Sequence, residues 1–336
     1  MNNVNDPPAS ACFLRVYADH RLGGKPRYYL AENEEALMLV PPEIRKCVAF
    51  LAIKDKTGDR LIGTAFFAGF NQAETASSLG FDVVYLVTAR HVVEKGIDRS
   101  IDKIIYIRMN TKDGAVGWVQ SQANQWRFHP DDNSVDVAAM AWAPPREEYD
   151  YLYVPENIAA TDEIIESQSI GVGDEVFLTG LFSSHFGKDR NIPIIRVGNI
   201  AAMPEEKIET SIGDIDAYLV EARSIGGLSG SPVFVHLSGV RKGSLALGKE
   251  PIFWLGLMHG HWDVKIRQDD TFDVDLFENE KVNMGIAIVI PVSKILETLN
   301  QEDFKKALEQ AEKKHKKNTL PTADSATDDD GKVAPP

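Results

Sequence analysis

The chain has 336 residues, of which 43% are hydrophobic, 9% aromatic and 26% charged, and its formal net charge is −14. This length exceeds what one small core needs, so we expect one large globular domain or two. The negative charge argues against nucleic acid and membranes as partners, because both need a basic surface to neutralise their phosphates.

Cysteine content and the apolar runs indicate the compartment. Two cysteines, Cys12 and Cys47, are too few for a disulfide framework. The opening residues, MNNVNDPPASACFLRV, lack a basic stretch followed by an apolar one, so no signal peptide is expected. The longest apolar runs, such as GIAIVIPV, are far shorter than the roughly 20 residues of a membrane helix. We therefore expect a cytoplasmic protein.

Taken in chain order, residues 1–45 have mixed composition and are interpreted as an N-terminal extension. Residues 46–150 then consist of short β-branched and aromatic runs separated by turn residues. The runs are CVAFLAI, LIGTAFFAGF, DVVYLVTA, KIIYIRM, VGWVQ and VDVAAMAW. Short strands at regular spacing are typical of antiparallel barrels and sandwiches, so this half predicts a first β-barrel.

Two residues of this half are candidates for acid–base chemistry. The segment VVYLVTARHVV (83–93) places His91 directly after a strand, where an imidazole can project into a cleft. A lone histidine there would by default be a packed or exposed one. Asp136 immediately precedes an apolar strand, where a buried carboxylate is costly without a partner. Together they suggest a base and the carboxylate that orients it.

A proline- and acid-rich stretch (144–167) separates this half from a second series of runs. These are EVFLTGLF, PIIRVGNIA, DAYLVEA, SPVFVHL, FWLGLMHG and MGIAIVIPV. They predict a second β-barrel over residues 151–300, and hence a mostly β fold of two antiparallel barrels. At its end, SKILETL (293–299) and residues 301–318 have apolar positions near helical spacing and predict one or two helices, of which 301–318 is a charged helix. Residues 319–336 are rich in proline and aspartate and predict a disordered tail.

The second series contains GGLSGSPVF (226–234), in which Ser229 stands between glycines. A plain β-turn would explain the glycines alone. A nucleophilic serine needs a base and an orienting carboxylate, and His91 and Asp136 are candidates for both. The nucleophile elbow of α/β-hydrolases is excluded, because its G-x-S-x-G pattern needs glycine where this chain has Ser231.

The motifs TARH, DVAAM and GGLSGSP, in this order, resemble the trypsin/chymotrypsin-like serine protease family over about residues 46–298. GTAFFA followed by LVTARHVV is similar to the HtrA-type and glutamyl-endopeptidase-like branches, and GIAIVIPVSKIL to the end of the HtrA protease domain. No PDZ domain is expected after residue 299. The resemblance implies a chymotrypsin-like double β-barrel that hydrolyses peptide bonds in protein or peptide substrates, with no cofactor and no metal.

The resemblance also implies residue roles. Ser229 would be the nucleophile, His91 the general base and Asp136 the residue that orients it, while the backbone N–H groups of Gly227 and Ser229 would form the oxyanion hole. Leu228 departs from the family, because activated trypsins carry an acid there that pairs with a freed N-terminus. The site is therefore expected to form without that ion pair.

By the same resemblance, the substrate pocket is lined by EARSI (221–225) and GLMHGH (256–261). Arg223, His259 and His261 there would favour an acidic P1 side chain, because a buried carboxylate needs a basic partner. Arg223 pointing to solvent or pairing with Glu221 is the alternative. His259 and His261 also have the spacing of a zinc-ligand pair, but no third ligand is evident.

Two functions remain open from the sequence. The first is a serine endopeptidase, which the presence of all three residues favours. The second is a catalytically silent protease-fold module that serves as a binding partner or scaffold. The sequence makes no prediction of oligomeric state.

Overall fold

The protein is described by a computed structural model over residues 40–70, 83–210, 213–222, 226–237, 240–241, 244–245, 252–265 and 281–307. Most of the predicted N-terminal extension, most of the predicted charged helix and the whole predicted tail lie outside these residues. Ile44 is fully buried in the core. The packed structure therefore begins before the predicted boundary at residue 46.

The first sheet contains eight strands. They are β1 (Val48–Asp55), β2 (Gly58–Phe70), β3 (Val83–Thr88), β4 (Ile104–Asn110), β5 (Val116–Gln122), β6 (Arg127–Phe128), β7 (Ala138–Ala141) and β8 (Val154–Pro155). Their hydrogen-bonding order is β5-β4-β1-β2-β3-β7-β6, with β8 parallel to β2. The two end strands, β5 and β6, are consecutive in the chain and joined by the 3-10 turn η4 (Ala123–Gln125), so the sheet curls back on itself.

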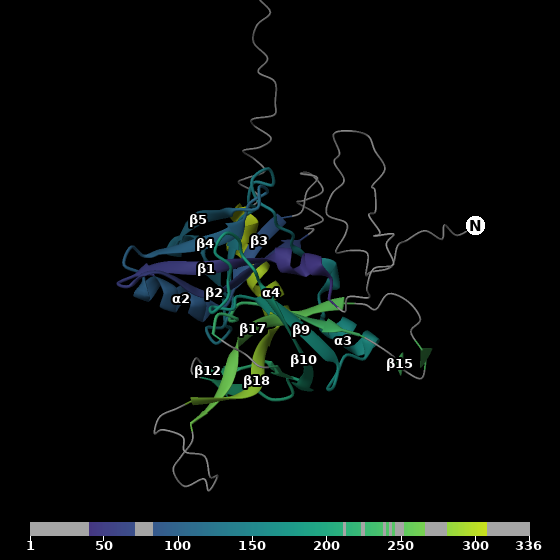
Figure 1. The fold of residues 1–336 in the computed structure, drawn as a ribbon. Coiled ribbons are helices and arrows are strands. Elements are labelled where there is room, and N and C mark those ends of the chain that lie inside the picture. The colour runs from purple at the N-terminus through teal and green to yellow at the C-terminus, as the bar shows by residue number, and fades with distance from the viewer. Residues whose placement is uncertain are drawn as a thin grey trace, which may run out of the picture.

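The second sheet is a closed six-stranded barrel in the order β10-β13-β18-β17-β14-β9. Its strands are β9 (Glu175–Gly180), β10 (Ile194–Ala202), β13 (Tyr218–Glu221), β14 (Pro232–His236), β17 (Ile252–Lys265) and β18 (Lys281–Pro291). Two small hairpins stand apart from it, β11 (Ile208–Thr210) with β12 (Gly213–Ile215) and β15 (Val240–Arg241) with β16 (Ser244–Leu245). The barrel lies below the first sheet in Figure 1, and the predicted mostly β fold is confirmed.

Helices are few and short in the described part of the chain. They are α2 (Arg90–Arg99), α3 (Asp162–Gln168) and α4 (Val292–Leu299), with 3-10 turns η3 (Pro42–Cys47) and η5 (Glu156–Ile158). Helix α4 follows β18 as the run SKILETL predicted, whereas α2 and α3 were not predicted. A further helical stretch starts at residue 302. No helix within the described ranges combines the length and the apolar character needed to cross a membrane.

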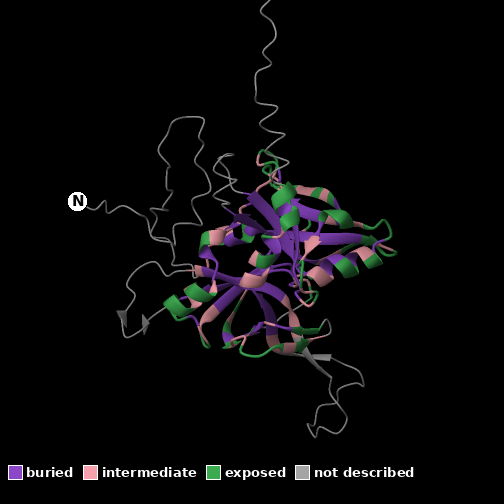
Figure 2. Ribbon diagram, turned by 180° about the vertical axis from the view of Figure 1, so that it is seen from behind, coloured by how far each residue is buried: buried purple, intermediate pink, exposed green. Residues whose placement is uncertain are grey.

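The described residues form two hydrophobic cores, of which one lies within the second barrel and the other is shared by both halves. The shared core includes Phe66 of β2 together with Phe177, Phe234 and Trp254 from the second barrel. The rings of Phe66 and Trp254 pack edge to face at 5.5 Å across the seam. Figure 2 shows that buried residues follow the strands, while exposed residues lie mainly on helices and loops. The seam is therefore a rigid place from which both halves can present side chains.

Candidate active site

His91 lies in the first turn of helix α2, directly after strand β3. The first backbone N–H groups of a helix have no acceptor within the helix. In this helix the N–H of His91 donates to Oδ1 of Asp136 at 2.8 Å. The carboxylate thus caps the helix at its electropositive end, where a negative charge is stabilised.

Asp136 is fully buried, in the segment that leads into β7. Its other oxygen, Oδ2, accepts a hydrogen bond from Nδ1 of His91 at 2.7 Å. Burial alone would raise the pKa of Asp136, but the hydrogen bonds from His259 and His91 outweigh it and lower the pKa to about 2. The carboxylate is therefore ionised at neutral pH, and the structure brings His91 and Asp136 together.

A second imidazole binds the same carboxylate. Nδ1 of His259, on strand β17, lies 2.5 Å from Oδ2 of Asp136. The rings of His259 and His91 meet edge to face with centroids 5.3 Å apart. The family resemblance implied that His259 lines the substrate pocket, and it did not predict this contact with Asp136. His261 follows two residues later and is partly exposed, and Arg223 lies outside the described residues.

The Ser229 loop is attached to strands of both halves. The carbonyl of Ser229 accepts from the N–H of Thr64 on β2 at 3.0 Å, and the N–H of Gly230 donates to the carbonyl of Met258 on β17 at 2.8 Å. Gly230 has a φ of +86°, and an added Cβ would lie 2.1 Å from the carbonyl oxygen of Thr64. Only glycine fits there. Both Ser229 and the His91 ring are described, and no hydrogen bond joins them.

Two backbone donors lie on either side of Leu228. Gly226 and Gly227 share a peptide whose carbonyl accepts a hydrogen bond from Oγ of Ser183 at 3.0 Å. The N–H and C=O of a trans peptide point in opposite directions, so the N–H of Gly227 points away from Ser183. Neither this N–H nor that of Ser229 donates to any residue that the structure describes.

Thr64 is a site residue that the sequence analysis missed. Its hydroxyl donates to the carbonyl of Gly227 at 2.8 Å and accepts from the N–H of Leu181 at 2.9 Å. Its carbonyl accepts from the hydroxyl of Thr88, at the end of β3, at 2.6 Å. The available signal was a threonine inside the apolar run GTAFFAGF, which is costly unless the hydroxyl has partners.

Leu228, which replaces the acidic residue of activated trypsins, is buried in the core of the second barrel. Its carbonyl accepts from the N–H of Ser231 at 3.0 Å and closes the turn around Ser229. An added Cβ on Gly180 would contact the Leu228 side chain at 3.2 Å, so that side chain packs against β9. An apolar contact thus holds the loop at this position.

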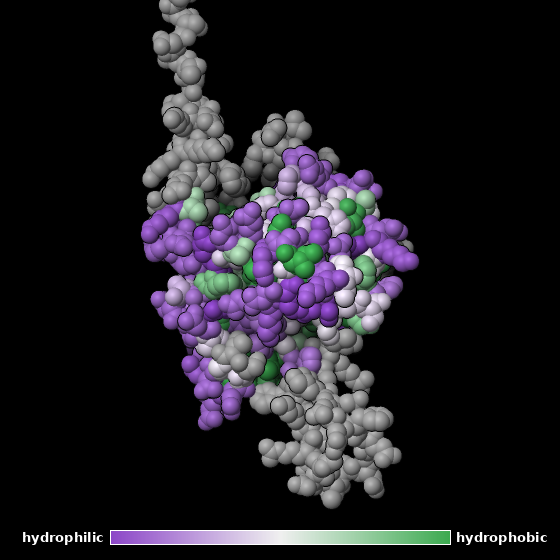
Figure 3. Space-filling view, turned by 90° about the vertical axis from the view of Figure 1, so that its left-hand side faces the viewer, coloured by the Kyte–Doolittle hydropathy of each residue, from purple (hydrophilic) through white to green (hydrophobic). Residues whose placement is uncertain are grey.

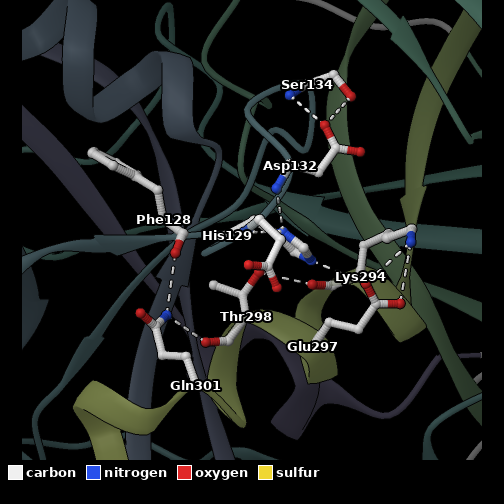
Figure 4. Close-up of polar contacts among 9 residues, drawn as sticks. Phe128, His129, Asp132, Ser134, Lys294, Glu297, Thr298 and Gln301 are labelled. Atoms are coloured by element: carbon white, nitrogen blue, oxygen red, sulfur yellow. Dashed lines mark hydrogen bonds and ion pairs between the residues drawn. The ribbon is translucent and has the colours of Figure 1, made fainter.

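The segment just before Asp136, which includes His129 and Asp132, is attached to helix α4 (Figure 4). His129 Nδ1 accepts from the N–H of Asp132 at 3.0 Å, so the ring proton lies on Nε2. Nε2 then donates to Glu297 of α4 at 3.0 Å. Helix α4 follows the last strand of the second barrel, so the second half of the chain helps to hold the Asp136 segment of the first.

The group of His91, His259 and Asp136 has ligand types that zinc accepts, and the ligand atoms lie within 4.8 Å of one another. Around a tetrahedral zinc with bonds of about 2.0 Å, however, the ligand atoms would be roughly 3.3 Å apart. The observed separations from Oδ2 of Asp136 are 2.7 and 2.5 Å. These are hydrogen-bond distances, so protons account for the cluster without a metal.

No family model and no curated protein matches the chain. Among solved structures it is similar to the MamO protease domain of Magnetospirillum magneticum in its apo form, with 12% identity, a TM-score of 0.45, and coverage of 77% of this chain and 99% of that one. It is also similar to the thermostable serine protease AL20 from an extremophilic microorganism, with 11% identity, a TM-score of 0.43, and coverage of 77% and 97%. A third is an inactive mutant form of Rv3671c from M. tuberculosis H37Rv, with 15% identity, a TM-score of 0.36, and coverage of 76% and 87%. These likenesses are distant, and the mostly β fold is defined by the strand pairings of the chain itself.

Proposed function

We propose that the protein is a serine endopeptidase that hydrolyses peptide bonds through Ser229, His91 and Asp136. The observation that carries this proposal is the hydrogen bond from Nδ1 of His91 to the buried, ionised carboxylate of Asp136. A buried carboxylate in this place fixes the tautomer of the imidazole and leaves Nε2 free to accept a proton. The Ser229 loop is attached to the same β2–β3 region.

In the proposed reaction, Oγ of Ser229 attacks the carbonyl carbon of the scissile peptide while Nε2 of His91 takes the hydroxyl proton. Asp136 stays ionised and stabilises the imidazolium. The tetrahedral intermediate then collapses, His91 gives the proton to the leaving amine, and an acyl-enzyme remains on Ser229. Water, deprotonated by His91, hydrolyses this ester and restores the serine.

The N–H groups of Gly227 and Ser229 would stabilise the oxyanion of each tetrahedral intermediate. Support comes from their lack of acceptors among the described residues and from the Ser183 contact that orients the peptide of Gly227. Preorganised donors of this kind contribute about a hundredfold to a thousandfold each to kcat.

A catalytically silent scaffold is the second candidate. It is favoured by one observation, the missing hydrogen bond between Ser229 and the ring of His91, both of which are described. In many proteases without substrate this contact is long and tightens only in the complex. The endopeptidase therefore remains the better-supported proposal.

Covalent labelling separates the two candidates. A fluorophosphonate probe should label the wild-type protein, and Ser229→Ala or His91→Ala should abolish the labelling. Ser231→Ala is the matched control, because this neighbouring serine is buried and its hydroxyl has no partner within the described structure. Folded wild-type protein that neither reacts with the probe nor cleaves a peptide library would contradict the endopeptidase and support the scaffold.

The finer part of the proposal is a preference for an acidic P1 side chain. It rests on the basic residues Arg223 and His261 in the two segments that the family resemblance places around the pocket. His259 no longer contributes to this argument, because its Nδ1 binds Asp136. A panel of peptides varied at P1 should be cleaved fastest after Glu or Asp. Fastest cleavage after Leu, Phe or Lys would overturn this preference and leave the endopeptidase standing.

A further inference from the structure

A bulge in strand β17 occurs at the residue that reaches Asp136. Met258 pairs with Val289 of β18 and Gly260 pairs with Ile288, so His259 is the extra residue between two consecutive pairs. A β-bulge changes the direction in which a side chain points, and bulges are frequent next to active sites. The strict alternation of side chains that would place His259 and His261 on one face is therefore broken at this point.

The backbone beside His259 is joined directly to the Ser229 loop. Met258 accepts from the N–H of Gly230 at 2.8 Å and donates from its own N–H to the carbonyl of Ser231 at 2.9 Å. The next side chain along β17 then crosses the seam to Asp136 in the first half. His259 is thus the side chain that connects the serine loop to the carboxylate of the His91 pair.

The chemistry of Asp136 fixes the protons on both rings. An ionised carboxylate can only accept hydrogen bonds, so Nδ1 of His91 and Nδ1 of His259 must each carry a proton. Both donate to Oδ2, at 2.7 and 2.5 Å, while Oδ1 accepts from the backbone N–H of His91. The side chains of His91 and His259 are 19% and 12% exposed, so water competes little for these bonds.

We infer that His259 is a positioning residue for His91, which acts by donating a hydrogen bond from Nδ1 to Oδ2 of Asp136. This donor, together with the backbone N–H of His91, holds the carboxylate in the plane in which it receives the His91 ring. The effect on reaction rate rests on the proposed endopeptidase function. The shared carboxylate and the two Nδ1–H tautomers do not depend on that function.

Loss of the His259 donor has a specific consequence. A buried, ionised Oδ2 would keep only one side-chain donor, and an incompletely satisfied charged group is costly. The carboxylate would then reorient or admit water, and either change loosens the Nδ1–H tautomer of His91. With the proton on Nε2 instead, His91 is unable to take a proton from Ser229.

Two substitutions separate the donor from the bulk of the ring. His259→Asn places an amide nitrogen close to the position of Nδ1 and keeps a donor, whereas His259→Leu keeps an apolar side chain and removes it. His236→Asn is the matched control. This buried histidine of β14 also contacts a carboxylate through Nδ1, Glu175 at 3.1 Å, at the end of the strand far from Ser229.

The primary measurement is proton and nitrogen NMR of histidine-labelled protein, which needs no turnover. Wild-type protein should show hydrogen-bonded Nδ1–H signals from both His91 and His259. His259→Asn should remove the His259 signal and keep the His91 signal. His259→Leu should remove the His259 signal and also remove or strongly shift the His91 signal. His236→Asn should leave both signals unchanged. The rate of fluorophosphonate labelling should fall about tenfold in the leucine variant. In the asparagine variant it should stay within about threefold of the wild-type rate.

Two results would overturn the inference. One is the absence of an Nδ1–H signal from His259 in the wild-type protein, a test that stands even if the leucine variant fails to fold. The other is an unchanged His91 signal and equal labelling rates in the asparagine and leucine variants. Wild-type protein that shows both signals but never reacts with the probe would reject the endopeptidase and keep the shared carboxylate.

Discussion

Among single residues, Thr64 connects the most parts of the site. Its hydroxyl bonds the carbonyl of Gly227 and the N–H of Leu181, its N–H bonds the carbonyl of Ser229, and its carbonyl accepts from Thr88. It is fully buried, so no water replaces a lost partner. Through its side chain and its backbone, this one residue of the first sheet holds the loop that contains Ser229.

Thr64→Val should test this role, because valine has nearly the shape of threonine and lacks the hydroxyl. We expect a loss of about 1–3 kcal/mol in the free energy of unfolding, since Leu181 N–H and Gly227 O each lose a buried partner. The rate of probe labelling should fall by about tenfold or more, since the peptides beside the oxyanion donors lose their support. Urea unfolding and labelling kinetics measure the two effects.

The chain offers a closely matched control for this substitution. Thr179, on neighbouring β9, is also fully buried, and its hydroxyl has no partner among the described residues. Thr179→Val should therefore leave stability unchanged or raise it, because an unsatisfied hydroxyl is removed. Equal losses in both valine variants would show that the hydrogen bonds of Thr64 are not what matters.

At the scale of elements, the connection between β9 and β10 (181–193) is held by a side chain from the opposite half. Arg108 of β4 is buried and donates to the carbonyls of Gly187 and Lys188, each at 2.8 Å, and to the side-chain oxygen of Asn191. The guanidinium also lies over the ring of Phe186 at 5.3 Å. This same connection carries Ser183, whose hydroxyl holds the peptide between Gly226 and Gly227, so Arg108 supports that peptide from a distance.

Arg108→Lys should loosen this connection while keeping the charge. An ammonium lacks the planar fork that serves three acceptors at once, so we expect a loss of about 2 kcal/mol in stability. Amide hydrogen exchange should quicken in 181–193 and stay slow in β4 and β5. Arg60→Lys is the control, because the exposed side chain of Arg60 makes only an ion pair with Asp55, at 3.8 Å, among the described residues, and such pairs contribute little. Unchanged exchange in 181–193 would contradict the role of Arg108.

The longer strands were predictable because local pattern decides them, whereas strands of two or three residues, such as β6 and β8, were not predicted. Each apolar run quoted from the sequence coincides with a strand, as LIGTAFFAGF does with β2 and SPVFVHL with β14. Helix α3 was missed because its seven residues, DEIIESQ, are too few to show a helical period. Helix α2 was missed because its first residues, RHVV, continue the apolar run of the preceding strand. Elements of this length depend on capping and packing, which a short sequence pattern does not reveal.

Sequence motifs predicted part of the candidate site, and a shift in strand register hid another part. The motifs predicted His91, Asp136 and Ser229, and the structure brings the first two together as a hydrogen-bonded pair. The contact between His259 and Asp136 was not, because it depends on a one-residue register shift against β18. A slip of one residue turns a side chain to the other face of a strand, and sequence alone does not locate such a shift.

At the scale of the whole molecule, the shared core and the high negative charge determine how the protein responds to acid. The core crosses the seam, so loss of one contact at the seam affects both halves. Figure 3 shows a largely hydrophilic face with small, separate hydrophobic patches. The net charge of −14 at pH 7 is reduced as carboxylates take up protons. Proton uptake first relieves the repulsion between negative charges. At lower pH it also neutralises the carboxylates whose ionised form stabilises the folded state.

Protonation of Asp136 should account for most of the stability that is lost at acidic pH. Its pKa is about 2 in the folded protein against an ordinary value of 3.8, so folding favours the ionised form. A lowered folded pKa adds stability above the unfolded pKa, and this is lost as the pH falls from about 3.8 towards 2. The difference corresponds to about 2 kcal/mol.

Urea unfolding of wild-type and Asp136→Asn protein should therefore give curves of stability against pH that lie apart at pH 6 and converge near pH 2. Asp303→Asn, which changes an exposed carboxylate, should follow the wild type throughout. Parallel curves for wild type and Asp136→Asn would mean that folding does not favour the ionised carboxylate, and the hydrogen bonds from His91 and His259 would then not stabilise its charge.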